Sequence, residues 1–137
     1  MSTVPFKLVT PTRTVFDGEA ELVIAVTTEG EEGILPRHAP FLSALKPGVL
    51  RANVVQSGQP QRLELATGEG FMQALPDRVT VLVDEALTFD EVDVALTRQE
   101  LAQALDRQKT AAEPYAGERE QGAIDFANAK LRLTGHH

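Results

Sequence analysis

Three features of the sequence contain side chains that could carry chemistry: His38, the acidic run Glu29–Glu32 and the carboxylates near residue 90. His38 could serve as a general base, which needs a partner that orients the ring and a pocket for a substrate. The sequence has no nucleophile elbow, no H-E-x-x-H metal motif and no glycine-rich phosphate loop to accompany it. We therefore predict that His38 is a structural or interface residue and that the chain has no catalytic residue. An enzyme that uses His38 with a nearby carboxylate remains the alternative.

The acidic residues do not have the spacing of a metal site. Glu29-Gly30-Glu31-Glu32 lacks the alternating ligands of a calcium loop, so it predicts a loop that faces solvent or a partner. Asp90 and Glu91 stand where a helix would begin, and the helix dipole favours acidic residues in the first turn. No cysteine is present, which excludes a thiolate zinc site and a disulfide. We expect neither a metal nor a cofactor.

Length and charge narrow the class of protein. The chain has 137 residues, which suits one domain or a small domain with an appendage. Its 20 acidic and 13 basic residues give a formal net charge of -7, and a nucleic-acid binder needs a concentrated basic face instead. The densest apolar run, Leu22–Val26, is far shorter than the ~20 residues that span a bilayer, and the first residues do not resemble a secretion signal. We expect a soluble, cytoplasmic protein.

The composition changes near residue 88. Residues 1–88 contain seven of the eight prolines and eleven of the thirteen valines, which favours short strands with frequent turns. Alternating apolar residues predict strands over 21–28, 49–56, 61–65 and 78–84, with a hairpin turn at Ser57-Gly58-Gln59-Pro60. Glycines and prolines between residues 29 and 40 predict a long ordered connection, a kind of segment that often carries function. We predict an antiparallel β-sandwich over residues 1–88.

Residues 89–137 are rich in alanine, leucine, glutamine and charged residues, which favours helix. Thr88 and Glu91 form a capping box, and apolar residues then recur at helical spacing up to Pro114 and Gly117. The sequence predicts an antiparallel helical hairpin whose second helix is short and broken early by Gly117 and Gly122. Because an alanine-rich seam buries little area, we expect the hairpin to dock on another surface and to be able to undock. The seam residues that we expect on the first helix are Val94, Leu101, Leu105 and Ala112, with Ala95, Ala102 and Ala104 beside them.

The segment Glu29-Gly30-Glu31-Glu32-Gly33-Ile34-Leu35-Pro36-Arg37-His38-Ala39-Pro40, followed by Lys46-Pro47-Gly48, resembles the epsilon subunit of the F-type ATP synthase. The start, Leu8-Val9-Thr10-Pro11, and Val79–Val83 also fit that family, over essentially the whole chain. The resemblance implies a non-catalytic rotor subunit that binds the gamma subunit and the c-ring, at the cytoplasmic face of the bacterial inner membrane. By the same resemblance, the subunit would be attached to the membrane only through the complex. The subunit-interface residues that the resemblance implies are Glu29, Glu31, Glu32, Gly33, Arg37, His38 and Pro40.

The family's hairpin can also extend into the alpha–beta catalytic hexamer and inhibit ATP hydrolysis, and in some members its compact form binds ATP. By resemblance, Asp93 and Arg132 match nucleotide-binding positions, whereas Leu96 and Gln103 stand where the family has arginines. With these cations missing, the phosphates would be poorly neutralised, so we expect weak ATP binding at most. Residues 89–137 carry six basic and nine acidic residues, and this net charge of −3 together with a short second helix predicts weak or absent inhibition. A free-standing sandwich that binds a small ligand is a further alternative.

Overall fold

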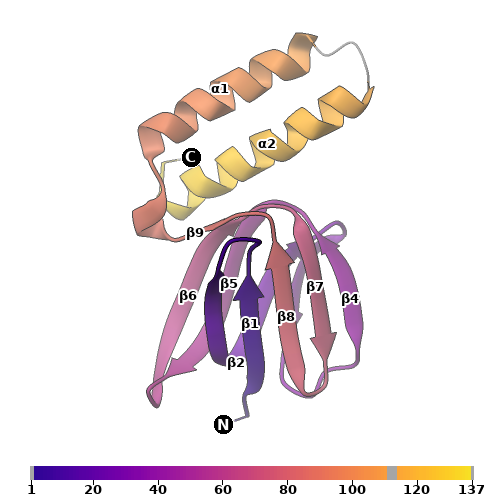
Figure 1. Ribbon diagram of the computed structural model, residues 1–137, viewed down its shortest axis with the longest axis vertical. Helices are drawn as coiled ribbons and strands as arrows, with labels where there is room; N and C mark the ends of the chain where they lie inside the picture. The colour runs from indigo at the N-terminus through magenta and orange to yellow at the C-terminus, as the bar shows by residue number, and fades with distance from the viewer. Residues whose placement is uncertain (1, 111–113, 137) are drawn as a thin grey trace.

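The computed structural model describes residues 2–110 and 114–136. It has two parts: a β-sandwich and a pair of antiparallel helices that lies across one end of it (Figure 1). The predicted sandwich followed by a helical hairpin is confirmed. The strands are β1 (Val4–Val9), β2 (Thr14–Thr27), β3 (Gly30–Ile34), β4 (Phe41–Leu45), β5 (Gly48–Gln56), β6 (Gln59–Thr67), β7 (Gly70–Leu75), β8 (Arg78–Val83) and β9 (Ala86–Leu87). The helices are the 3-10 turn η1 (Phe89–Glu91), α1 (Val94–Thr110) and α2 (Pro114–Leu133).

The strand β2 connects the two layers of the sandwich. The strand order is β1-β8-β7-β4-β2-β5-β6-β9, with β3 paired to β2 and with β1 also paired to β2. Thr14–Ala20 of β2 pairs with β1 and Glu19–Ile24 pairs with β5, with a bulge between Ala20 and Leu22. Such a bulge bends a strand and lets it pass from one layer to the next. The predicted antiparallel pairing has one exception, because β1 and β8 run parallel.

The hairpin between β5 and β6 is confirmed, but its turn is shorter than the predicted Ser57–Pro60. Gln56 pairs with Gln59, so the loop contains only Ser57 and Gly58. Both residues have positive φ values, 51° and 75°, as a type I′ turn requires.

The predicted long loop over residues 29–40 is wrong in its first half. Gly30–Ile34 forms β3, which pairs antiparallel with β2 through the register Ile24↔Gly33 and Thr27↔Gly30. A tight turn makes this possible: Gly30 has φ 118°, and the Thr27 hydroxyl donates to the Gly30 carbonyl at 2.7 Å and accepts from the Glu29 amide at 3.1 Å. Only Leu35–Pro40 is irregular. An edge strand needs no buried face along its length, so the apolar alternation that marks the other strands is absent from it.

The sandwich core follows the alternation of the strands. On β8, Val79, Val81 and Val83 are buried, as expected, while the residues between them face outward. Leu65 and Met72, from β6 and β7, are fully buried beside them in the same cluster. Among the described residues this core involves none from α1 or α2, so the sandwich holds a hydrophobic core of its own.

The first helix begins later than the capping box suggests. Thr88 and Glu91 do form the box, but it caps the 3-10 turn η1. The helix α1 starts at Val94, and the Asp93 carboxylate accepts the amide of Leu96 at 3.0 Å as its N-terminal cap. The expected seam is partly wrong. Thr97 and Ala104 are the buried residues of α1 and Leu105 is 42% exposed, while the expected seam residue Ala112 lies outside the described residues.

The prediction of a short, broken second helix is wrong. The helix α2 runs continuously from Pro114 to Leu133 and includes Gly117 and Gly122. Proline is tolerated in the first turn of a helix, where its missing N–H has no partner to lose. At Gly122 the helix passes close to the sandwich, since a Cβ there would lie 2.8 Å from Oε1 of Glu69, a side chain that can rotate away.

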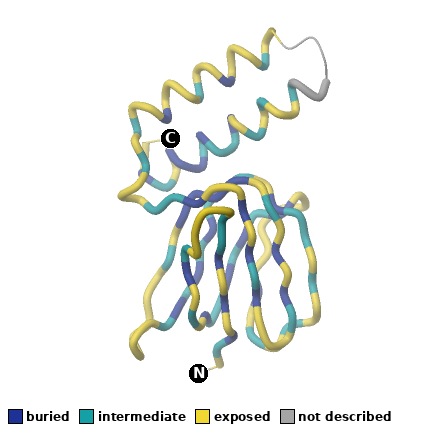
Figure 2. The backbone as a smooth tube through the Cα atoms, in the orientation of Figure 1, coloured by how far each residue is buried: buried dark blue, intermediate teal, exposed yellow. Residues whose placement is uncertain are grey.

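Polar contacts join the two helices to each other. Arg107 pairs with Glu120 at 2.9 Å, and Gln108 donates to the side chain of Gln121, also at 2.9 Å. Within residues 2–110 and 114–136, no hydrogen bond or ion pair joins α1 or α2 to the strands. The second half of α2 is buried while α1 is mostly exposed (Figure 2), so α2 is the helix that rests on the sandwich. No helix of the described ranges is long and apolar enough to cross a membrane.

Candidate interaction surfaces

One outer face of the sandwich exposes large apolar side chains. Leu42 on β4 is 71% exposed, Phe71 on β7 is 58% exposed and Leu82 on β8 is 49% exposed. Phe71 pairs directly with Leu82 and with Ala44, and Leu82 pairs with Val9 of β1. Ala44, Phe71, Leu82 and Val9 therefore form a row across β4, β7, β8 and β1. We call Val9, Leu42, Ala44, Phe71 and Leu82 the apolar face. A contiguous apolar patch on a sheet is typical of a protein–protein contact.

Sequence reasoning missed the apolar face. The signal was present, since Phe71 and Leu82 are apolar at positions where the alternation of β7 and β8 calls for outward, polar residues. Their neighbours Met72 and Val81 point into the core. An apolar residue on both sides of a strand therefore marks a surface that is covered by something else.

The predicted acidic residues lie at the β2–β3 turn and on the edge strand β3. Glu29, Glu31 and Glu32 are all exposed. The register pairs Glu31 with Val26, and the Glu31 carboxylate forms an ion pair with Arg51 of β5. Glu32 has no ion-pair partner among the described residues. The edge formed by β3 and its preceding turn is therefore negatively charged, and Arg51 partly neutralises the charge of Glu31.

The other predicted interface residues begin at Gly33, directly after Glu32, and continue beyond the end of β3. This strand has five residues, so at ~3.3 Å per residue its ends are about 13 Å apart. Gly33 is exposed near the end of β3, and Arg37, with φ 65°, His38 and Pro40 follow in the irregular connection to β4. We call Glu29, Glu31 and Glu32 the acidic group and Arg37, His38 and Pro40 the group around His38; the two groups are continuous through Gly33 of β3.

His38 does not have the surroundings of a general base. The ring is half-buried, and Nδ1 lies 2.7 Å from the carbonyl oxygen of Ala39, so this nitrogen donates a hydrogen bond to the backbone. The other nitrogen, Nε2, is buried and has no partner within the described part of the chain. No carboxylate of that part orients the ring, which the enzyme alternative requires.

The two residues with predicted nucleotide-binding roles are not brought together. Asp93 caps α1, as described above, and Arg132 is exposed at the end of α2. Arg132 lines a hollow of about 440 Å³ over the outer face of β2 and β5, with Leu133 and Val49. Neither Asp93 nor Arg132 lines the cavity between the sandwich and the hairpin.

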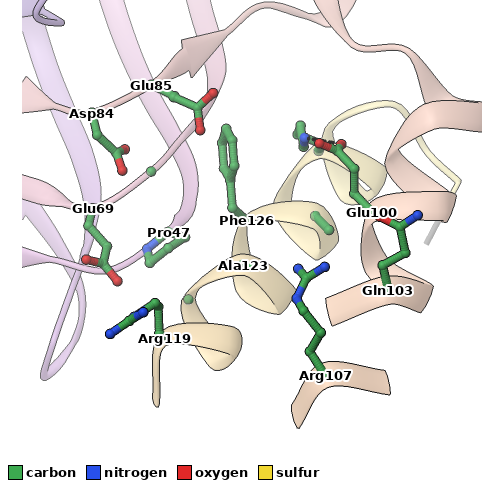
Figure 3. Close-up of a pocket in the computed structure, with 14 residues that line it drawn as sticks. Pro47, Glu69, Asp84, Glu85, Glu100, Gln103, Arg107, Arg119, Ala123 and Phe126 are labelled. Atoms are coloured by element: carbon green, nitrogen blue, oxygen red, sulfur yellow. Dashed lines mark hydrogen bonds and ion pairs between the residues drawn. The ribbon is translucent and has the colours of Figure 1, made fainter. Parts of the chain in front are cut away.

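That cavity has a volume of about 460 Å³ and mixed charge. Figure 3 shows Glu69, Asp84 and Glu85 on the sandwich side and Gln103 and Arg107 on α1. Four carboxylates line the cavity against three cations, Arg107, Arg119 and Lys130, so its net charge is slightly negative, which disfavours an anionic ligand, and Gln103 adds no charge.

A buried cation of the same cavity is already satisfied within the hairpin. Lys130 is 7% exposed, and its Nζ donates to Oε1 of Glu100 at 2.8 Å. The same Nζ lies 4.6 Å from the centre of the Phe126 ring, at the range of a cation–π contact. No group of three or more potential metal ligands occurs in residues 2–110 or 114–136.

Comparison with known proteins finds relatives along the full length. Residues 3–89 match the family model described as ATP synthase, Delta/Epsilon chain, beta-sandwich domain. The chain is 35% identical over 136 residues to the ATP synthase epsilon chain of Chromobacterium violaceum, covering 99% of this chain and 96% of that one. It is 34% identical over 134 residues to the epsilon chain of Ruminiclostridium cellulolyticum, covering 98% and 97%. A chain in the Euglena gracilis mitochondrial ATP synthase assembly has the same fold, with a TM-score of 0.79 at 18% identity over 99% of this chain and 83% of its own.

Proposed function

The chain belongs to the ATP synthase delta/epsilon family, and on that premise we propose that it is a rotor subunit of the central stalk of an F-type ATP synthase. In this role it couples ion flow through the c-ring to ATP synthesis in the catalytic sector and performs no catalysis itself. The observation that carries the proposal is the similarity over the whole chain, which includes the hairpin as well as the sandwich. The complex holds the subunit at the cytoplasmic face of the bacterial inner membrane.

The apolar face supports a lasting contact with the gamma subunit. Phe71, Leu42 and Leu82 project from a rigid sheet, and burial of large side chains on such a sheet gives a stable interface at little cost in conformational entropy. The group around His38 adds polar contacts to the same partner. The acidic group supports a contact with basic loops of the c-ring, where charge fixes orientation more than it adds affinity.

Co-purification with the gamma subunit and the c-ring tests this assignment. Phe71→Glu places a charge in the middle of the apolar face and should abolish capture of gamma by the tagged chain. Gln61→Glu, at an exposed position of β6, adds the same charge elsewhere and should leave capture unchanged. Capture of gamma by Phe71→Glu at the wild-type level would contradict the use of the apolar face.

The acidic group calls for a separate measurement. Glu32→Lys reverses a charge that has no ion-pair partner among the described residues, and it should weaken binding of the isolated stalk to the c-ring most strongly at low salt. His38→Ala, in parallel, should weaken gamma binding and leave the salt dependence of c-ring binding as it is. Equal binding of Glu32→Lys and wild type to the c-ring at low salt would remove β3 from that interface.

We further propose that this chain binds ATP weakly and inhibits hydrolysis weakly. Support comes from Leu96 and Gln103 at positions where the family has arginines, and from Lys130, whose charge is taken up by Glu100. The length of α2 gives no reason for weak inhibition, so that expectation now rests on the net charge of −3 in residues 89–137. Calorimetry with ATP should give no heat below millimolar ligand. Deletion of residues 89–137 should change hydrolysis by the reconstituted catalytic complex less than twofold, and a several-fold activation would refute weak inhibition.

A further inference from the structure

Arg13 joins the sandwich to the segment that leads into the hairpin. It belongs to the turn between β1 and β2, where the Thr10 amide donates to the Arg13 carbonyl at 2.9 Å. The Nη2 atom of Arg13 lies 3.1 Å from the carbonyl oxygen of Ala86 and 3.2 and 3.1 Å from the two carboxylate oxygens of Glu91. One guanidinium therefore holds both ends of the linker Ala86–Glu91.

The linker has one further attachment to the strands and one set of bonds within itself. It starts as β9, which pairs with β6 through Thr67↔Ala86 and Ala66↔Leu87. At its other end, Oε1 of Glu91 accepts the backbone amide and the hydroxyl of Thr88, both at 3.0 Å. These bonds lower the pKa of Glu91, with the amide of Thr88 as the largest cause, so the carboxylate is charged and available to Arg13 at neutral pH.

The polar connection to the sandwich ends at Glu91. Val92 follows in an extended conformation, with φ −84° and ψ 123°. The hydrogen bonds of Asp93 all go forward into α1, to Leu96 and Thr97. From Val94 on, the described hydrogen bonds and ion pairs lie within the hairpin, whose helices hold each other through pairs such as Lys130–Glu100.

We propose that Arg13 clamps the linker Ala86–Glu91 to the sandwich, so that the hairpin reorients about Val92 and Asp93. The linker then moves with the sandwich and α1 with α2 moves as a second body. The two residues between them carry no polar contact to the strands. This inference concerns the isolated chain and does not depend on the proposed assembly.

Amide hydrogen exchange on the full chain tests the clamp. An exposed charge pair contributes up to about 1 kcal/mol, so Arg13→Ala should speed exchange at the amides of Thr88, Glu91 and Val92 about two- to fivefold. The amides of α1 and α2 should keep their wild-type rates. Arg13→Lys retains the charge without the planar fork and should fall between the two. Arg62→Ala removes an equally exposed arginine that bonds Asn53 and Glu64, away from the linker, and serves as the matched control.

Distance measurements between pairs of spin labels test the pivot. Because the chain has no cysteine, labels can be placed on Gln56 of the sandwich together with either Asp90 of the linker or Gln99 of α1. Ala129 is fully buried and lies seven residues from Gly122, so it shares the helix face that rests on the sandwich. Ala129→Glu should undock that face and broaden the Gln56–Gln99 distances while the Gln56–Asp90 distances stay narrow.

The two experiments have clear opposing outcomes. Unchanged exchange of the linker amides in Arg13→Ala, or the same acceleration in Arg62→Ala, would show that Arg13 is no clamp. Broadening of the Gln56–Asp90 distances along with those of Gln56–Gln99 in Ala129→Glu would place the pivot before the linker. If neither pair broadens in that variant, the hairpin does not move as a body and the proposal is overturned.

Discussion

Gly70 permits the close pairing of β7 and β8 on which the apolar face depends. A Cβ at this position would lie 1.8 Å from the carbonyl oxygen of Leu82 and 2.7 Å from Cα of Val83. Both are backbone atoms, which cannot rotate away as a side chain can. To bring the first contact from 1.8 Å to even 3.0 Å, the two strands would have to separate by roughly 1.2 Å at their Gly70↔Val83 pair. Gly70→Ala therefore changes the backbone of the sheet.

We expect Gly70→Ala to destabilise the fold by about 3 kcal/mol, the upper part of the range for overpacking, because the strain falls on a buried strand pair. For a chain of this size that free energy lowers the midpoint of thermal unfolding by about 10 °C. The assay is thermal unfolding followed by circular dichroism. Co-purification with gamma should weaken in parallel, since Phe71 and Leu82 follow Gly70 and precede Val83 in the distorted pair.

Gly117→Ala is the matched control for this substitution. None of the described residues lies within 4 Å of the position that a Cβ would take at Gly117, and the residue is within α2. Alanine is a better helix former than glycine by roughly 0.5–1 kcal/mol, so this variant should unfold at or slightly above the wild-type temperature. A Gly70→Ala variant that unfolds within 2 °C of wild type would refute the steric argument.

Three further predictions concern the core, the linker and the hairpin. Leu65→Ala removes a fully buried side chain from the sandwich core and should cost about 3–4 kcal/mol in the free energy of unfolding, measured by urea titration. Because the pKa of Glu91 is lowered from an ordinary 4.5, its stabilisation of the linker is complete above pH 4.5 and is lost as the pH falls through the lowered value. Amide exchange in the linker, corrected for intrinsic rates, should therefore accelerate in that acidic range, and should not do so in Glu91→Gln. Glu100→Gln leaves the buried Lys130 ammonium without its counter-charge and should destabilise the helix pair by about 1 kcal/mol, seen as faster exchange in α1 and α2 but not in the strands; unchanged rates would show that Phe126 and solvent suffice.

Strands with one buried face could be predicted from the sequence. Val79, Val81 and Val83 alternate with outward residues, and Ser57-Gly58 is the pair that a tight hairpin turn needs. The strand β3 could not be predicted in this way, because Gly30–Gly33 is exposed throughout and its pairing with β2 depends on backbone bonds alone. Edge position is a property of the assembled sheet and leaves no periodic signal in the segment itself.

In the hairpin, the helices could be predicted from the sequence but their buried faces could not. Gly122 reads as a helix breaker, but it lies within α2, where the helix passes close to Glu69, a residue more than fifty positions earlier. Leu105 reads as a seam residue by its type, although the buried face of α1 follows Thr97 and Ala104. Sequence periodicity locates helices, while tertiary contacts decide which of their faces is covered.

Of the candidate site, the acidic residues and His38 were identified from the motif and the apolar face was not. The motif is continuous along the chain, whereas Leu42, Phe71 and Leu82 come from three strands and meet only through the register of the sheet. The clamp has the same origin, since Arg13 and Glu91 are 78 positions apart.

The passage of β2 through both layers has a mechanical consequence. A subunit fixed to a turning shaft and loaded at another point is sheared, and a sandwich held only by apolar contact between its layers could slide under that load. Here sliding of one layer over the other would have to stretch the covalent backbone of β2, whose fourteen residues pair with β1 in one layer and with β5 in the other. The load then falls on peptide bonds and on ladders of hydrogen bonds strained together along the strand. The sandwich is thus a stiff element, and the flexible part of the molecule is the segment that follows the last strand, β9, and precedes α1.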